Sequence, residues 1–210
     1  DVYKRQEPEK TFEEVLDEHP VSIQVNGQWQ TFPNAKAAEE ASYEEYKANL
    51  RRNAKNFRIT DEHLGEGGPK AKFQANVNAI RLLKELESAG QQASPEQQEV
   101  LSRYVGWGGL ADCFDEKHSR YAELKALLTE EEYAAARASS LTAFYTPPVL
   151  IDAIYQALAQ MGLESGNLLE PACGVGNFMG MLPDSMRDCK VYGVELDSIS
   201  GRIARQLYQN

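Results

Sequence analysis

Alternating apolar and polar residues on both sides of an Asn-Gly pair form the first clear pattern in the chain. Residues 21–25 (Val-Ser-Ile-Gln-Val) and 28–32 (Gln-Trp-Gln-Thr-Phe) have the period of a strand and flank Asn26-Gly27. Asn-Gly favours the positive φ angles of a two-residue turn, so the pattern predicts a β-hairpin. Two strands alone are marginally stable, and the hairpin therefore needs a packing partner. Residues 35–57, rich in alanine and charge without Gly or Pro, predict a helix after it.

Helical periodicity dominates from residue 71 to about residue 140. Apolar residues three or four positions apart predict a helix over 71–88 that ends near Gly90; they are Phe73, Val77, Ile80, Leu83 and Leu86. Ser94 and Thr129 each precede a Glu or Gln by three residues, which predicts capping boxes and helices to about 104 and 138. Residues 104–110 (Tyr-Val-Gly-Trp-Gly-Gly-Leu) favour a buried corner under the tryptophan over a ligand contact.

The pattern changes in the last third of the chain. Pro147 and Pro148 open a helix whose predicted apolar face holds Val149, Leu150, Ala153, Ile154, Ala157, Leu158 and Met161. Short apolar runs at 168–170 and 190–195 predict strands, and a further helix is marked by Ile199, Ile203 and Leu207. Helix, strand, helix, strand, helix is the order of a parallel α/β sheet. Since two strands do not complete such a sheet, we expect the domain to continue past residue 210.

These elements predict an α/β protein with four segments. Residues 1–20 form a polar tail, whose first six residues resemble translated adapter sequence. Residues 21–58 are the hairpin and its helix, and 59–141 are a mainly helical region. Residues 142–210 are the first part of the α/β domain.

Composition narrows the class of protein. The 210 residues are 42% hydrophobic and 26% charged, which is typical of a globular protein and excludes wholesale disorder. No apolar run approaches the roughly 18 residues that span a bilayer, and no secretory signal opens the chain. The chain has three widely spaced cysteines, Cys113, Cys173 and Cys189, and three isolated histidines. They predict neither disulfides nor a metal site, and favour the reducing cytoplasm.

Charge limits the contribution of this chain to nucleic-acid binding. Acidic residues outnumber basic ones, 32 to 22, and they do so in each of the segments 1–60, 61–142 and 143–210. If the protein acts on DNA, most of the DNA-binding surface should lie outside these residues. A cluster of cations suits either a helix C-terminus or a phosphate contact; it comprises Lys47, Arg51, Arg52, Lys55 and Arg58. The glycine-rich loop before Lys70 does not match a P-loop, because Pro69 intervenes and Ala71 follows.

The candidate ligand-binding residues lie at the ends of the two predicted strands and in the turn that follows the first strand. Gly174 and Gly176 follow the first strand, where their backbone can approach a ligand closely. Glu195 ends the second strand, where an acid can bind ribose hydroxyls. Met179 stands where a dinucleotide fingerprint needs its third glycine, so NAD is not expected. Glu170 favours a cationic cofactor without phosphate, such as S-adenosylmethionine.

Three motifs together resemble those of a known family. They are residues 169–178 (Leu-Glu-Pro-Ala-Cys-Gly-Val-Gly-Asn-Phe), 193–197 (Gly-Val-Glu-Leu-Asp) and 145–148 (Tyr-Thr-Pro-Pro). The chain resembles the gamma class of S-adenosylmethionine-dependent adenine-N6 DNA methylases. Residues 56–73 and 104–110 look more loosely like the region before the methylase core in large methylase–helicase proteins of mobile elements.

The resemblance implies that residues 142–210 begin a Rossmann-like domain. It also implies that the chain is the N-terminal part of an enzyme that methylates adenine N6 in DNA. Thr146 would contact the methionine carboxylate of S-adenosylmethionine, Glu170 its amine side, Glu195 the ribose and Leu196 the adenine face. The other implied cofactor-binding residues are Tyr145, Ala172, Cys173, Gly174, Gly176 and Phe178.

The catalytic motif of that family, Asn/Asp-Pro-Pro-Tyr/Phe, follows the second motif, so no catalytic residue is expected within residues 1–210. Thr146-Pro147-Pro148-Val149 lacks both the group that would hold the target amine and the aromatic that would stack on the base. Cys173 has no nearby base in the sequence, which favours packing over nucleophilic catalysis. DNA is the expected partner, without a membrane or a metal. A non-catalytic DNA- or protein-binding module and a methylase acting on RNA or protein remain alternatives.

Overall fold

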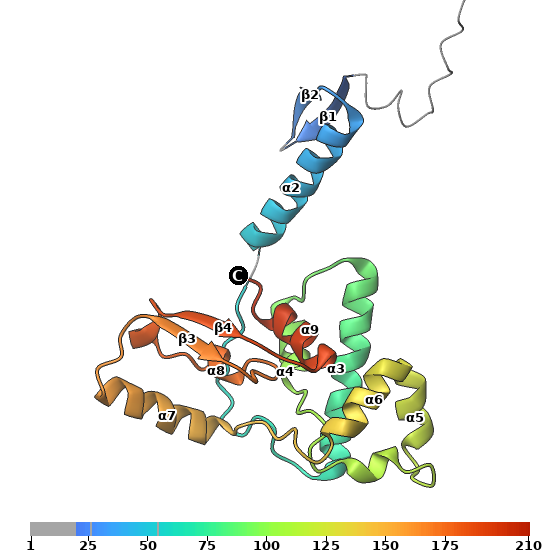
Figure 1. Cartoon of the computed structure of the whole chain (residues 1–210), viewed down its shortest axis with the longest axis vertical. Coiled ribbons are helices and arrows are strands. Elements are labelled where there is room, and N and C mark those ends of the chain that lie inside the picture. Colours follow the sequence, from blue (N-terminus) through green and yellow to red (C-terminus); the bar gives the residue numbers. More distant parts are fainter. Residues whose placement is uncertain (1–19, 26, 54) are drawn as a thin grey trace, which may run out of the picture. The chain divides into compact units, whose positions relative to one another are not determined.

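The computed structural model describes residues 20–25, 27–53 and 55–210, without the side chains of 46–53 (Figure 1). Contacts divide the chain after Asn53 into two units, which are described separately below. The predicted tail, apart from its last residue, lies outside the described residues. So do the side chains of Lys47, Arg51 and Arg52 in the predicted cation cluster.

The first unit contains the predicted hairpin and a helix packed on it. Strands β1 (Val21–Val25) and β2 (Gln28–Phe32) pair antiparallel, with Val25 opposite Gln28. Helix α2 (Ala35–Asn53) begins where the Asn34 side chain accepts a hydrogen bond from the Ala37 amide at 2.9 Å. The hairpin is therefore confirmed, and α2, which ends four residues before the expected end at 57, is the partner that the two strands need.

The second unit begins with helices that match the capping signals of the sequence. Its helices up to residue 139 are α3 (Pro69–Ala89), α4 (Pro95–Ser102), the 3-10 helix η1 (Ala111–Phe114), α5 (Tyr121–Leu127) and α6 (Glu130–Ser139). The predicted capping boxes form at Ser94 and at Thr129, and the apolar stripe of α3 is buried throughout. The hydrophobic pattern of the sequence did not predict η1 and α5 as separate helices, because each is too short to show a clear helical period.

The end of the second unit has the expected alternation of helices and strands. Its elements are α7 (Pro148–Gln160), β3 (Asn167–Glu170), α8 (Asn177–Gly180), η2 (Asp184–Met186), β4 (Lys190–Gly193) and α9 (Ser198–Leu207). In the described part of the chain, β3 and β4 form a two-stranded parallel sheet, with Glu170 opposite Gly193. A mixed α/β protein is therefore confirmed.

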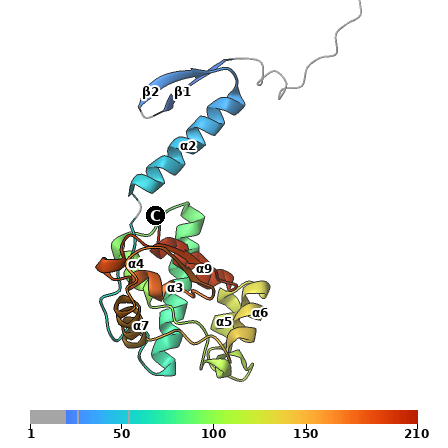
Figure 2. The ribbon, with the colours of Figure 1, turned by 60° about the vertical axis from the view of Figure 1, so that its left-hand side comes forward.

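One hydrophobic core joins the helical region to the last helix. Ile199, Ile203 and Leu207 of α9 lie in the same buried cluster as the apolar stripe of α3. Trp107 is also in this cluster, 1% exposed, as the predicted buried corner requires. Figure 2 shows α3 and α9 side by side from a second direction. The core thus extends across the boundary expected at 141/142, and the two segments stabilise each other.

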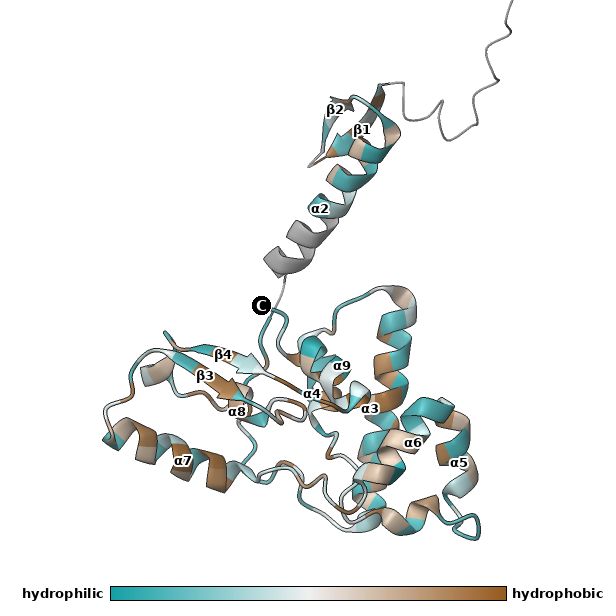
Figure 3. Cartoon of the chain, in the orientation of Figure 1, coloured by the Kyte–Doolittle hydropathy of each residue, from teal (hydrophilic) through white to brown (hydrophobic). Residues whose placement is uncertain are grey.

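Helix α7 presents a different face to the protein from the one predicted. Ile151 and Tyr155 are buried against Met186, in a second, smaller cluster. Much of the predicted apolar face is exposed instead: Val149 at 70%, Leu150 at 54%, Ile154 at 43% and Met161 at 81%. The brown segments of α7 in Figure 3 show how apolar this helix is. The apolar face that the sequence pattern predicts is therefore largely exposed, because no described element covers that side of α7.

Candidate functional site

A glycine turn connects the end of β3 to α8. Gly174 and Gly176 have φ angles of +56° and +86°, in the left-handed region that favours glycine. The Cys173 amide donates to the carbonyl of Val194 at 3.0 Å, which ties the turn to the residues after β4. The turn therefore lies at the carboxyl edge of the parallel strands, where α/β proteins bind ligands.

Glu195 holds this turn through its carboxylate. One oxygen accepts a hydrogen bond from the Gly174 amide at 2.7 Å, and the other accepts one from the Asp197 amide at 2.8 Å. Asp197 in turn caps α9 by accepting a hydrogen bond from the Ser200 amide. A carboxylate offers about four lone-pair sites, so Glu195 can position the turn and still accept from a ligand hydroxyl.

Tyr145 packs between two glycine turns. A Cβ atom on Gly174 would lie 3.1 Å from the Tyr145 ring, and one on Gly106 would lie 3.3 Å from it. The Tyr145 hydroxyl and the Ser200 hydroxyl share a hydrogen bond of 2.7 Å. Burial raises the pKa of Tyr145, which stays a neutral phenol at physiological pH. Tyr145 therefore joins residues 104–110, the Gly174 turn and α9.

The side chain of Asn76, on α3, holds the turn at 104–110 in place through hydrogen bonds. This fully buried side chain donates to the Gly106 carbonyl at 2.6 Å and accepts from the Val105 amide at 2.9 Å. The Gly108 amide donates to the Ala143 carbonyl at 3.0 Å, and a Cβ on Gly108 would lie only 2.2 Å from that oxygen. The helical region thus holds the segment that carries Tyr145.

Two cavities lie beside Tyr145. The larger, of about 460 Å³, is lined by five of the predicted residues, namely Tyr145, Ala172, Gly174, Glu195 and Leu196. The smaller, of about 240 Å³, is lined by Tyr145 and Thr146 together with residues of the helical region. Phe144 and Tyr104 also line both cavities. The structure therefore brings six of the ten predicted residues to two neighbouring cavities.

The other four predicted residues do not line either cavity. The Phe178 ring packs edge-on against Tyr155, with 5.9 Å between ring centroids. Gly176 lies so close to Tyr208 that a Cβ atom would be 2.3 Å from its ring. Cys173 packs against Gly193, and burial raises the pKa of its thiol, which disfavours a nucleophilic thiolate. Glu170 ends β3, partly exposed.

The sequence interpretation missed the contribution of residues 104–110 to the larger cavity. Tyr104, Gly106 and Trp107 line it in addition to forming the buried corner. The Tyr104 hydroxyl and the Trp107 indole N–H are buried without a hydrogen-bond partner in the described part of the chain. The three glycines around Trp107 could have indicated a ligand-binding turn. The cavity they help to form also needs Tyr145, however, which lies some 40 residues later in the sequence.

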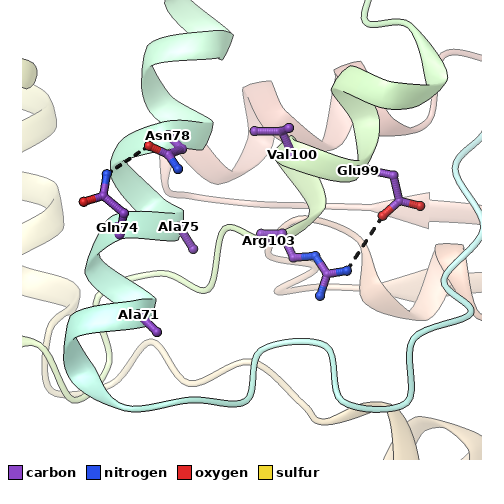
Figure 4. A pocket seen from close by; sticks show the side chains of 7 residues that line it. All are labelled: Ala71, Gln74, Ala75, Asn78, Glu99, Val100 and Arg103. Atoms are coloured by element: carbon purple, nitrogen blue, oxygen red, sulfur yellow. Dashed lines mark hydrogen bonds and ion pairs between the residues drawn. The ribbon is translucent and has the colours of Figure 1, made fainter.

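A further groove, between α3 and α4, carries none of the predicted residues (Figure 4). It has a volume of about 540 Å³. Its polar side chains pair with each other, Gln74 with Asn78 at 2.9 Å and Arg103 with Glu99 at 3.9 Å. The groove therefore offers a ligand little unsatisfied hydrogen bonding.

Within the described ranges, no cluster of three or more His, Cys, Asp or Glu side chains could hold a metal ion. No helix described there combines the length and the apolar character needed to cross a bilayer.

Two known proteins are similar to parts of this chain. The first is the Defense against restriction protein B of Escherichia phage P1, 26% identical over 144 residues, which are 69% of this chain and 5% of that protein. The second is the type II methyltransferase M.CvrRI of Paramecium bursaria Chlorella virus XZ-6E, 33% identical over 67 residues, which are 32% of this chain and 17% of that protein. The chain thus matches only a small part of either relative. No protein-family model matches the chain, and no solved structure matches it.

Proposed function

We propose that this chain is the cofactor-binding part of a DNA methyltransferase that transfers a methyl group from S-adenosylmethionine to the N6 atom of adenine. The observation that carries the proposal is the pairing of the Gly174 turn with Glu195 at the carboxyl edge of two parallel strands. This is the position of the nucleoside site in Rossmann-like folds, to which we assign residues 142–210. The similarity to a type II methyltransferase supports the same reading.

The residues present are compatible with S-adenosylmethionine. The cavity of about 460 Å³ lies in the usual size range of small-molecule sites. Glu195 would accept hydrogen bonds from the ribose, Leu196, fully exposed, would contact the adenine, and Gly174 would allow close approach of the ligand. Thr146 and Glu170 would bind the amino-acid part. The bound cofactor supplies an electrophilic methyl group, and this chain binds and orients it.

In this proposal the residues that bind the target adenine follow residue 210. DNA is the partner, the cytoplasm is the location, and DNA contacts come mostly from regions outside this chain. The acidic balance of the chain supports that division of roles.

The test is methyl transfer by the intact protein. S-adenosylmethionine with a labelled methyl group is incubated with DNA, RNA and protein substrates, and labelled nucleosides are identified by mass spectrometry. We expect N6-methyladenine in DNA. Label found in RNA or protein alone would contradict adenine-N6 DNA specificity and favour a methylase for another substrate.

A second candidate is a non-catalytic binding module. The observation in its favour is the set of exposed apolar side chains at the strands, with Leu169 at 66%, Val194 at 57% and Leu196 at 100% exposure. Such surfaces often bind a partner. An intact protein that binds DNA or a protein but neither binds S-adenosylmethionine nor transfers its methyl group would favour this module.

A further inference from the structure

The smaller cavity beside Tyr145 combines donor side chains from three separate segments. Lys72 comes from the first turn of α3, Thr146 from the segment before α7, and Asn177 from the start of α8. All three side chains are partly exposed, and none has a hydrogen-bond or ion-pair partner in the part of the chain that the structure describes. A set of unpaired donors around one cavity is suited to a ligand with acceptor oxygens.

Lys72 is the cation among the described residues that line this cavity. The acid there, Glu66, is exposed and bonds to His63 at 3.1 Å. The first turn of α3 contains Lys70 and Lys72, has no acidic residue, and begins at Gly68 without a side-chain cap. A cation near the positive N-terminal end of a helix is unfavourable unless an anion is close. A negatively charged ligand group near Lys72 would therefore be stabilised by both the lysine and the helix end.

The size and position of the cavity indicate which anionic group it takes. Its volume is about 240 Å³, and it shares Tyr104, Phe144 and Tyr145 with the larger cavity to which we assign the nucleoside. A ligand with a nucleoside at one end and an α-amino acid at the other would place its carboxylate near Lys72. A phosphate would carry more negative charge next to Glu66 and is less favourable.

We propose that Lys72, from the helical region, binds the carboxylate of the cofactor's amino-acid part, together with Thr146 and Asn177. This inference rests on the proposed function, because it takes the larger cavity as the nucleoside site. It gives residues 59–141 a direct part in binding the cofactor, in addition to supporting the segment that carries Tyr145.

The test compares two ligands on the intact protein by calorimetry. S-adenosylhomocysteine contains the carboxylate, whereas 5′-methylthioadenosine contains the nucleoside without the amino acid. Lys72→Gln should weaken S-adenosylhomocysteine about 10-fold, as loss of one charge-assisted hydrogen bond predicts, and change 5′-methylthioadenosine less than about 2-fold. Lys72→Arg keeps the charge and should retain most of the affinity.

The matched control is Lys70→Gln, since Lys70 lies in the same helical turn, is exposed and does not line the cavity. It should leave both affinities unchanged. Equal effects of Lys72→Gln on both ligands, or no effect on either, would overturn the role of Lys72 while leaving the proposed function intact. Failure of the wild-type protein to bind either ligand would overturn the proposed function, and this inference with it. Unchanged thermal unfolding of the Lys72 variants shows that they remain folded.

Discussion

An ion network around the buried carboxylate of Glu132 connects the helical region to α9, and its removal should destabilise the second unit. Arg202 of α9 bonds to Glu132 and to Glu87, each at 2.6 Å. Glu132 also accepts hydrogen bonds from Lys84 at 2.8 Å and from the Thr129 amide at 3.0 Å. The Glu132 side chain is only 8% exposed, so its charge depends on these partners.

The size of the effect follows from the pKa of Glu132. Burial by itself would raise this pKa, but hydrogen bonds from Lys84 and Arg202 outweigh it and lower the pKa from 4.5 to about 2. A lowered carboxyl pKa stabilises the folded state above the unfolded pKa, and this stabilisation is lost as the pH falls toward the folded pKa. The lowered pKa of Glu132 stabilises the folded state by about 3 kcal/mol at pH 7 and by about 1.5 kcal/mol at pH 3.

We therefore expect Glu132→Gln to lower the free energy of unfolding by about 3 kcal/mol at pH 7 and by about half as much at pH 3. Urea unfolding, followed by tryptophan fluorescence, measures both values. Trp107 is buried in the core and reports on the second unit, whereas Trp29 is 72% exposed in the first unit and is replaced by Phe in all variants.

The control is Glu130→Gln on the same helix. Glu130 is 83% exposed and bonds to Lys125 on the surface, where an ion pair contributes about 0–1 kcal/mol. If Glu132→Gln cost no more than Glu130→Gln at pH 7, or if its cost did not fall at pH 3, the network would not stabilise the unit as argued.

Three further predictions concern the site and the exposed surface. Glu195→Ala should weaken S-adenosylmethionine binding by about 1–3 kcal/mol in the intact protein; an unchanged calorimetric affinity with an intact fold would remove this residue from the site. Gly108→Ala should cost about 1–3 kcal/mol of stability in urea unfolding, because its Cβ would overlap the Ala143 carbonyl, whereas Gly68→Ala, with no atom within 4 Å of its Cβ, should cost less. The 210-residue chain alone should self-associate through its exposed apolar side chains, and Leu169→Lys should reduce this in sedimentation; equal association of both proteins would show that another surface is responsible.

Local sequence signals predicted much of the fold. The alternation in residues 21–25 and 28–32 predicted the two paired strands, and Ser94 and Thr129 marked helix starts, because each of these features acts within a few residues. The face of α7 could not be predicted in the same way. Both of its sides are apolar, and burial of Ile151 depends on its contact with residues near Met186.

The candidate site was predictable where its residues lie in one motif. Gly174 and Glu195 follow from the strand–turn–helix pattern, and the structure brings them within 2.7 Å. The contribution of Asn76 could not be predicted, because its hydrogen-bond partners lie about 30 residues away in the sequence. Lys72 lines its cavity with residues up to about 100 positions later, which local sequence patterns do not reveal. Their roles depend on the packing of the helical region against the strands.

The central claim is that S-adenosylmethionine binds between the Gly174 turn and the turn at 104–110. Hydrogen exchange of the intact protein, measured with and without the cofactor, tests it most directly. We predict added protection in residues 104–110, 172–176 and 195–197, and none in α5, which lines neither cavity. Binding without added protection in these three segments, or protection confined to other parts of the chain, would contradict the account.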